Sequence, residues 1–207
     1  MRRLLLVRHA STRATRQACF APEDPLDARG RGEAAALRAE LPRSADFVVG
    51  PCLGAFQTAS LAGGAPLVIE QALADCDYGR WAGRPLDQVR RDEPEAVEAW
   101  LTDPDAVPHG GESMRALLTR AGEWLDEQAG RDGTLVAVAP GAVVRAIVVC
   151  ALGAPTDAFW RIDVSPASVT ELHARPGCWT LTRVNDRSAA RSAGTGAEED
   201  GVAASGA

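Results

Sequence analysis

Short apolar runs that alternate with longer amphipathic segments constrain this chain more than any other feature of its sequence. The apolar runs predict strands, and the amphipathic segments predict helices that bury one face. The expected strands are residues 4–7, 47–49, 67–69, 134–139, 168–173 and 179–184, of which the last two form a closing antiparallel pair. The expected helices are residues 29–41, 57–61, 95–101, 114–128 and 143–152. Fully apolar strands separated by helices are typical of an α/β fold with a mostly parallel sheet covered by helices on both faces.

The domain organisation follows from the length of the chain and from a change in composition near residue 186. A chain of 207 residues is of the size expected for one domain, which we place at residues 1–185. From residue 186 onward the sequence turns to Ser, Ala, Gly and acidic residues without periodicity. We therefore expect residues 186–207 to form a disordered tail.

The overall charge and hydropathy exclude several classes of partner. The net charge is −6, which argues against binding to nucleic acid through bulk electrostatics. No apolar run approaches the roughly 18 residues that span a bilayer, so we expect no membrane partner. The apolar run at residues 4–7 is cut short by Arg8, and it is too short for a secretory signal. These features favour a cytoplasmic protein.

The residue types that are missing or scattered exclude several chemistries. The chain contains no lysine, so a Schiff base, a pyridoxal-phosphate anchor and a P-loop lysine are all excluded. Its five cysteines are spread along the chain without a CxxC pair, which favours isolated thiols in a reducing compartment. We expect neither a metal nor a cofactor.

The first candidate for chemistry stands at the end of the first predicted strand. Arg8 and His9 directly follow the buried run at residues 4–7. Ligands of open α/β sheets bind beyond the carboxyl ends of the strands, so both side chains are expected at such a site. A lone histidine here would more often only cap a strand end, but the adjacent arginine favours a functional role.

Five segments, in order, resemble the motifs of the histidine phosphatase superfamily, the phosphoglycerate-mutase-like proteins. Residues 8–12 (RHAST) resemble Arg-His-Gly-Glu-Thr, and residues 50–59 (GPCLGAFQTA) resemble Ser-Pro-Leu-x-Arg-Ala-x-Gln-Thr-Ala. Residues 73–83 (LADCDYGRWAG) resemble Leu-x-Glu-x-Asp-Phe-Gly-x-Trp-Glu-Gly, and residues 108–113 (PHGGES) resemble Pro-Gly-Gly-Glu-Ser. Residues 138–145 (VAPGAVVR) stand where the family has Val-Thr-His-Gly-Gly-Val-Ile-Arg. The resemblance covers roughly residues 3–150 and implies a phosphoglycerate-mutase-like fold.

The resemblance also implies roles for individual residues. His9 matches the nucleophile that attacks a phosphoryl group, Arg8 matches one of the two arginines that hold it, and Asp75 stands where the family has its glutamic acid. Asp77 is an alternative acid, although a turn-capping role suits it better. The expected substrate-binding residues are Arg13, Arg84, Glu112 and Ser113.

Two positions depart from the family in a way that bears directly on activity. The second arginine of the family falls on Gly54, and its second histidine falls on Pro140, so half of the four-residue phosphate pocket is missing. Removing one such donor typically costs on the order of 10²–10³ in rate. Gly54 is expected to leave room but no charge, and Pro140 has no backbone N–H to offer instead.

Nearby residues offer limited replacement for the two missing groups. Shifting the alignment by one or two positions recovers neither of them. Arg13, Arg80 or Arg84 could supply charge from loops. His109 is interpreted as a solvated loop residue and His173 as structural.

Three functions remain open on the sequence. The first, which we favour, is a repurposed enzyme that acts on a small carboxylated or phosphorylated metabolite bearing less charge than a phosphomonoester. The second is a silent binding or regulatory protein of this fold, and the third is a weak phosphomonoesterase rescued by loop arginines. Specificity is expected to lie in a lid-like insertion at about residues 75–111, in which Trp81 and Trp100 are predicted to be core residues. The sequence does not indicate an oligomeric state.

Overall fold

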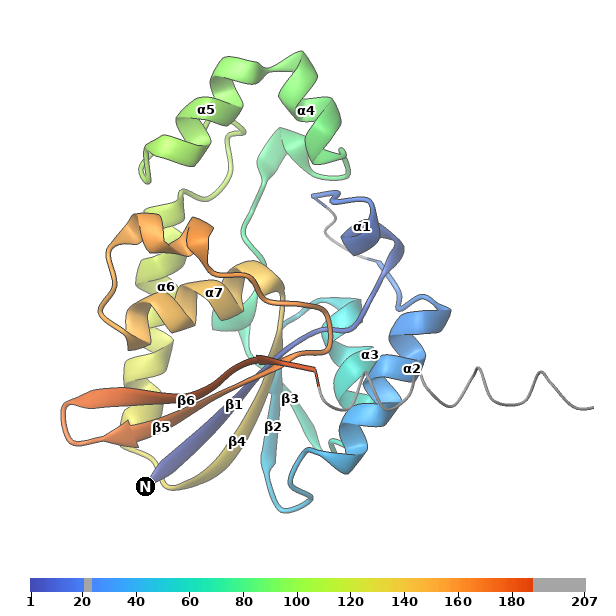
Figure 1. Ribbon diagram of the computed structural model, residues 1–207, viewed down its shortest axis with the longest axis vertical. Coiled ribbons are helices and arrows are strands. Elements are labelled where there is room, and N and C mark those ends of the chain that lie inside the picture. The colour runs from blue at the N-terminus through green and yellow to red at the C-terminus, as the bar shows by residue number, and fades with distance from the viewer. Residues whose placement is uncertain (21–23, 188–207) are drawn as a thin grey trace, which may run out of the picture.

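Six strands form one mixed sheet in the order β3-β2-β4-β1-β5-β6 within residues 1–20 and 24–187, which the computed structural model describes (Figure 1). The strands are β1 (Arg2–Arg8), β2 (Asp46–Val49), β3 (Leu67–Ile69), β4 (Gly133–Ala139), β5 (Val169–Arg175) and β6 (Cys178–Asp186). The first four strands run parallel, β5 runs antiparallel to β1, and β6 runs antiparallel to β5. The predicted fold class and the closing antiparallel pair are confirmed.

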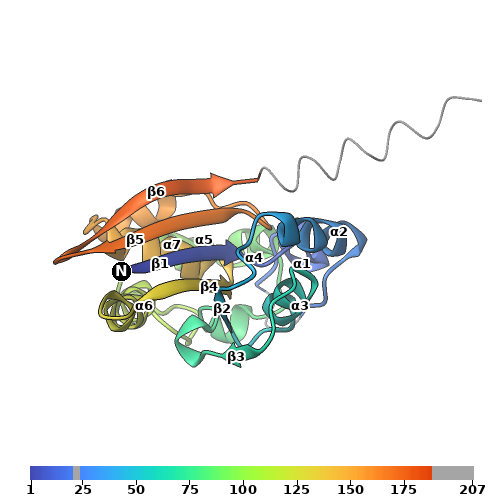
Figure 2. The same cartoon turned by 90° about the horizontal axis from the view of Figure 1, so that it is seen from below.

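Helices cover both faces of the sheet, and the strand sequences explain why (Figure 2). Side chains alternate between faces along a strand. In β1, Leu4 and Leu6 therefore pack into the core with α6 and α7, whereas Leu5 and Val7 pack into the core with α2 and α3. These helices are α2 (Ala28–Ala36), α3 (Leu53–Leu61), α6 (Met114–Ala129) and α7 (Gly141–Ala151). With both faces covered, the middle residues of β1 and β4 are apolar on both sides of the sheet, as the sequence indicates.

Some helices differ from the sequence-based expectation. The helix predicted over residues 29–41 ends earlier, because α2 gives way to the 3₁₀ helix η1 (Leu37–Ala39). Two short helices were missed, α1 (Arg13–Arg16) and α4 (Leu86–Asp92). Each buries a single side chain, Ala14 and Val89 respectively, so neither shows an apolar periodicity. The remaining elements are α5 (Pro94–Thr102), η2 (Gln71–Leu73), η3 (Gly79–Trp81) and η4 (Thr156–Arg161).

The segment at residues 75–111 carries η3, α4 and α5 beyond the carboxyl ends of the parallel strands (Figure 1). It has a small apolar core of its own, built around Trp81 and Trp100, and Phe20 from the segment after α1 joins it. The ring centroids of Trp81 and Trp100 lie 5.7 Å apart in an edge-to-face arrangement. Both tryptophans are buried, which confirms their assignment to the core. Aromatic packing thus fixes this segment over the end of the sheet.

The C-terminal end of the described chain and the helix lengths complete the fold. The predicted tail, residues 186–207, falls outside the described residues except for residues 186 and 187, and β6 extends through Asp186. No helix in the described part of the chain is both long and apolar enough to cross a bilayer.

Candidate active site

A cavity of about 270 Å³ lies at the carboxyl end of the parallel strands, where this class of fold binds ligands. Arg8 and His9 enter it from the end of β1, and Asp75 enters from the segment after η2. Gly54 lines it from the first turn of α3, and Pro140 lines it from the N-cap position of α7. The remaining lining residues are Thr12, Ala14, Thr15, Ala18, Cys19, Phe20, Asp24, Cys52, Tyr78, Leu86 and Ala142. The fold therefore brings the three predicted catalytic residues and both departures into one cavity.

The hydrogen bonding of His9 fixes which of its ring nitrogens can react. Nδ1 lies 3.0 Å from the carbonyl oxygen of Ala10. A carbonyl can only accept, so Nδ1 carries the proton and Nε2 keeps its lone pair. Burial lowers the pKa of His9 to about 4, against a smaller opposing effect of the bond to Ala10. His9 is therefore neutral at physiological pH, which is the state that a nucleophile needs.

Thr58 holds the segment that carries His9 against helix α3. Its hydroxyl accepts a hydrogen bond from the backbone N–H of Ala10 at 3.0 Å and donates one to the carbonyl of Gly54 at 2.7 Å. Thr58 is completely buried, so these bonds form without competition from water. The backbone N–H of His9 also donates to Ala139 at the end of β4, at 3.0 Å. The imidazole is thus positioned from both α3 and β4.

The guanidinium of Arg8 lies across the first turn of α7. A Cβ atom at Gly141 would come within 2.9 Å of Nε of Arg8, so a larger residue there would require the Arg8 side chain to shift. Nη1 of Arg8 donates to the carbonyl of Val164, which anchors the side chain at the cavity wall. Arg8 can therefore present a fixed positive charge next to His9.

Asp75 has the protonation behaviour of a general acid. Burial raises its pKa to about 6, although the N–H of Cys76, 2.9 Å from Oδ1, and the charge of Arg8 both act in the opposite direction. A carboxyl group with such a pKa still carries its proton over part of the mildly acidic range. The alternative acid, Asp77, is exposed and accepts a hydrogen bond from the N–H of Gly79 at 2.8 Å, which confirms its turn-capping role.

Gly54 and Pro140, where the sequence departs from the motifs that it resembles, line the same cavity as His9, and Gly54 differs from its sequence-based interpretation. A Cβ atom at Gly54 would stand 3.2 Å from Nδ1 and 3.5 Å from Cγ of His9, so the expected room beside this position is largely taken by the imidazole. Pro140 occupies the N-cap position of α7, where no side chain caps the helix. Neither position offers a charged or donating side chain to a ligand.

The described wall of the cavity carries little positive charge. Among the described lining residues, Arg8 is the only side chain with a permanent positive charge, and it faces two carboxyl groups, those of Asp24 and Asp75. Asp24 accepts a hydrogen bond from the N–H of Ala14 at 2.6 Å. A dianionic ligand would thus meet one cation and up to two negative charges.

The arginines predicted to replace the missing charge lie elsewhere. Nη1 of Arg84 binds Glu93 at 2.7 Å, and Nη2 binds Asp92 at 2.7 Å. Arg80 also binds Glu93 and donates to the carbonyl of Pro108. Arg13 is exposed on α1 and is absent from the described cavity wall. The pairing of Arg84 within its own segment explains why it does not reach the predicted substrate site.

The other predicted substrate-binding residues have local structural roles. Glu112 pairs with Arg120 at 2.8 Å, and Ser113 caps α6 by accepting from the N–H of Ala116 at 3.1 Å. Neither lines the described cavity wall. The interpretation of His109 as a solvated residue was wrong, because it is only 1% exposed and packs edge-on against Trp81. His173 pairs with Glu171 at 2.7 Å on β5, which agrees with a structural role.

Several cavity residues were not predicted from the sequence. Asp24 and Thr15 reach the cavity from the segment between β1 and α2, whose path is set by tertiary contacts. Tyr78 was not predicted at the cavity either, although it follows Asp75 by three residues in the sequence. Within the described residues, 1–20 and 24–187, no three histidine, cysteine or acidic side chains are grouped closely enough to hold a metal ion.

The comparison with known families decides the assignment. The profile of the histidine phosphatase superfamily (branch 1) matches residues 4–187. The chain belongs to the histidine phosphatase superfamily. Phosphoserine phosphatase 1 of Hydrogenobacter thermophilus is 29% identical over 185 residues, which cover 84% of this chain and 87% of that protein. Glucosyl-3-phosphoglycerate phosphatase of Mycolicibacterium vanbaalenii is 29% identical over 217 residues, with 88% and 96% covered.

A solved structure of the same superfamily resembles this histidine phosphatase fold closely. A mycobacterial glucosyl-3-phosphoglycerate phosphatase in complex with VO₃ superposes with a TM-score of 0.80 at 26% identity. The similarity covers 89% of this chain and 99% of that one. The superfamily fold is therefore retained over nearly the whole described chain.

Proposed function

We propose that this chain is a metal-independent hydrolase for a small metabolite whose reacting phosphoryl group carries one negative charge rather than two. The fixed tautomer of His9 carries the proposal, because it leaves Nε2 unprotonated in a cavity that also holds a protonatable acid. The single cation of the described wall supports the charge of the substrate, since Arg8 alone balances one negative charge.

The proposed reaction has two steps. In the first, Nε2 of His9 forms a bond to phosphorus while the bond from phosphorus to the leaving oxygen breaks, and Asp75 gives its proton to that oxygen. In the second, water attacks phosphorus, the bond to Nε2 breaks, and the carboxylate of Asp75 takes a proton from the water. Arg8 neutralises the phosphoryl oxygens throughout. The free enzyme is regenerated with His9 neutral and Asp75 protonated.

The names of the relatives support a small phosphorylated metabolite as the substrate, and the residues of the cavity favour a particular charge on its phosphoryl group. Their names specify phosphoserine and glucosyl-3-phosphoglycerate, which are small phosphorylated metabolites. Each presents a phosphomonoester, for which the family pocket has two arginines and two histidines. With Gly54 and Pro140 in place of two of these groups, a singly charged phosphodiester or a phosphomonoester monoanion suits this cavity better than a dianion.

A metabolite comparison tests the proposed function. The wild-type chain, His9→Ala and the matched control His173→Gln are incubated with a small-molecule extract of the source cells, and mass spectrometry compares the mixtures. His173 lies outside the described cavity wall, so its variant controls for loss of a histidine. We expect a phosphorylated metabolite to be consumed by the wild type and His173→Gln but not by His9→Ala. Identical metabolite profiles for all three proteins would support a silent binding protein instead.

A further inference from the structure

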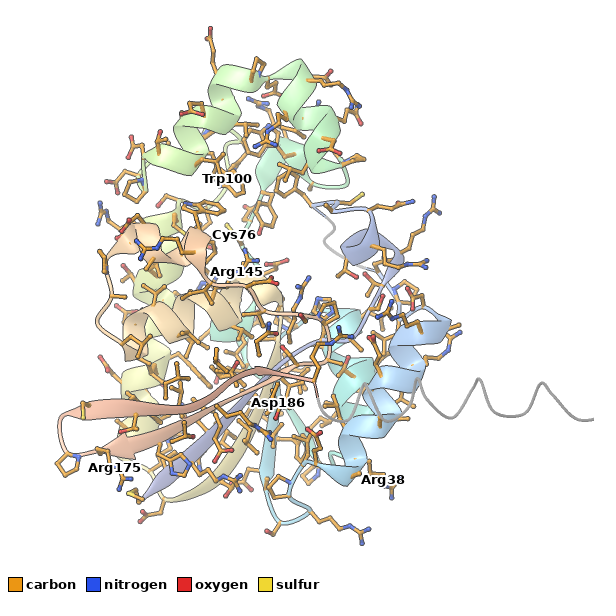
Figure 3. All side chains as sticks on the ribbon, in the orientation of Figure 1. Arg38, Cys76, Trp100, Arg145, Arg175 and Asp186 are labelled. Atoms are coloured by element: carbon orange, nitrogen blue, oxygen red, sulfur yellow. The ribbon has the colours of Figure 1, made fainter. Side chains whose placement is uncertain are left out.

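A second, smaller cavity adjoins the catalytic one. It measures about 140 Å³ and shares Arg8, Tyr78 and Ala142 with the larger cavity. Trp100 from α5 and Arg145 from α7 line it from two different elements. Figure 3 shows the labelled Trp100, Cys76 and Arg145 in the region between the α4–α5 segment and α7. The two cavities therefore share part of their walls, at the position of Arg8.

Buried donors without acceptors gather around the small cavity. Nε1 of Trp100, Nε of Arg145 and Nε of Arg8 are all buried and lack a hydrogen-bond partner in the described structure. Buried donors are nearly always paired, because an unpaired one loses the free energy of its hydration. All three donors belong to residues that line the small cavity, so an acceptor bound there would lie next to residues whose donors lack a partner.

The charges at this place point to an anionic acceptor. The guanidinium of Arg145 is close enough to Arg8 to help lower the pKa of Arg8, although burial is the larger cause. The counter-ion of Arg145 is Asp163, whose nearest oxygen is 3.6 Å from Nη2 and whose side chain is 80% exposed. This pair is loose and solvated, so it leaves Arg145 largely available to an anion in the cavity.

The walls restrict the group that carries this anion. Trp160 packs edge-on against both Trp100 and Phe159, at centroid distances of 4.7 and 4.9 Å. The guanidinium carbon of Arg145 lies 5.8 Å from the ring centroid of Phe159. The cavity thus combines an apolar aromatic wall with a cationic end. The small size of the cavity, with Arg145 as the cation that Arg8 does not need for the phosphoryl group, suits one carboxylate on a short apolar or flat carbon skeleton better than a dianionic phosphate.

We propose that this cavity is a carboxylate subsite in which Arg145 pairs with a carboxylate of the substrate and Nε1 of Trp100 donates a hydrogen bond to it. The inference rests on the proposed function and deepens it, because it makes the substrate a phosphorylated carboxylic acid. Arg8 then balances the phosphoryl group, and Arg145 balances the carboxylate. The length of the substrate is set by the separation of the two cavities.

Benzoate and its uncharged amide, benzamide, test the subsite by NMR. The chain has five tryptophans, so a protein labelled with ¹⁵N in the indole rings gives one resonance for each, and Trp100→Phe identifies that of Trp100. We expect benzoate to shift the Trp100 resonance and benzamide not to do so. In Arg145→Gln the affinity for benzoate should fall by about tenfold or more, as for loss of a charged hydrogen-bond partner.

The controls separate this inference from the proposed function. Arg161→Gln removes an exposed arginine of η4 and should leave benzoate binding unchanged, while the other four indole resonances report whether each variant is folded. His9→Ala should also keep the binding, because His9 does not line the small cavity. Equal affinity for benzoate and benzamide, no shift of the Trp100 resonance, or unchanged affinity in Arg145→Gln would overturn the subsite. Retained benzoate binding without any hydrolysis would overturn only the proposed function.

Discussion

A Cβ atom at Gly54 would lie 3.2 Å from Nδ1 of His9, so the position at which the resembled motif has its second arginine lies directly against the imidazole. This contact is tighter than ordinary van der Waals packing, so a side chain at residue 54 requires the imidazole to shift by a few tenths of an ångström. A side chain at residue 54 that brings charge to the cavity would therefore also move the imidazole of His9. Restoring the family residue changes both at once.

Restoring the two missing phosphate ligands should raise turnover of a phosphomonoester. We expect Gly54→Arg combined with Pro140→His to hydrolyse p-nitrophenyl phosphate at least about tenfold faster than the wild type, since one such donor contributes on the order of 10²–10³ elsewhere. The gain is held below that range by the close contact with His9. Gly54→Ala adds the Cβ atom without the charge and should bring no gain. A double variant no faster than the wild type would show that the scaffold cannot use these groups.

The pH dependence should report the two groups that exchange protons. His9 must be unprotonated to attack, so kcat/KM rises with pH through its pKa of about 4. Asp75 must be protonated to donate, so kcat/KM falls as pH rises through its pKa of about 6. Steady-state kinetics with the substrate found in the extract should therefore give a bell-shaped profile centred near pH 5. Asp75→Asn should remove the upper limb, and a profile still rising above pH 7 would contradict these roles.

Asp75 should also make stability depend on pH. Because its folded pKa of about 6 lies above the unfolded value, the folded protein binds the extra proton, and this contribution is lost as pH rises through 6. Asp75→Asn should thus match the wild type near pH 4 and exceed its free energy of unfolding by about 3 kcal/mol at pH 7. Urea denaturation at both pH values measures the difference. Asp77→Asn makes the same substitution at an exposed turn and serves as the control for the change of residue type.

The positioning role of Thr58 can be separated from the chemistry. Thr58→Val keeps the shape of the side chain but leaves the buried N–H of Ala10 without an acceptor, which should cost about 1–3 kcal/mol of unfolding free energy. It should lower kcat as well, because Ala10 follows His9 directly. Thr119→Val is the matched control, since the hydroxyl of Thr119 only donates within its own exposed helix turn. Equal losses of unfolding free energy in both variants would show that the hydrogen bond to Ala10 contributes no more to stability than an exposed one.

The sequence was sufficient to predict the strands and helices whose buried residues follow a regular pattern along the chain. In β1, four successive apolar residues predict a strand buried on both faces, and the structure packs Leu5 and Leu6 into opposite cores. The short helix α4 was not predicted, because Val89 is its one buried side chain and gives no periodic pattern. The burial of His109 also had no local signal, since it arises from contact with Trp81, 28 positions earlier in the chain.

The site was predicted only where its residues follow from local sequence patterns. His9 and Arg8 follow a strand, and strand ends meet at a predictable edge of the sheet. Arg84 was expected at the substrate because a lone arginine in a loop looks available, but Glu93 binds it at 2.7 Å. Partners of long charged side chains depend on how separate turns pack, and no spacing in the sequence specifies that. The small cavity beside Arg145 likewise arises only where α5 approaches α7.

The charge preference of the catalytic cavity tests the central claim most directly. Methyl p-nitrophenyl phosphate and p-nitrophenyl phosphate share a leaving group, but at pH 7 the diester carries one negative charge and the monoester close to two. The measurement is the ratio of their kcat/KM values with the wild-type chain, with His9→Ala as the blank. With Arg8 as the sole cation on the described wall, we predict that the diester is the better substrate and that His9→Ala hydrolyses neither. A clear preference for the monoester, lost in His9→Ala, would contradict the account and identify an ordinary phosphomonoesterase.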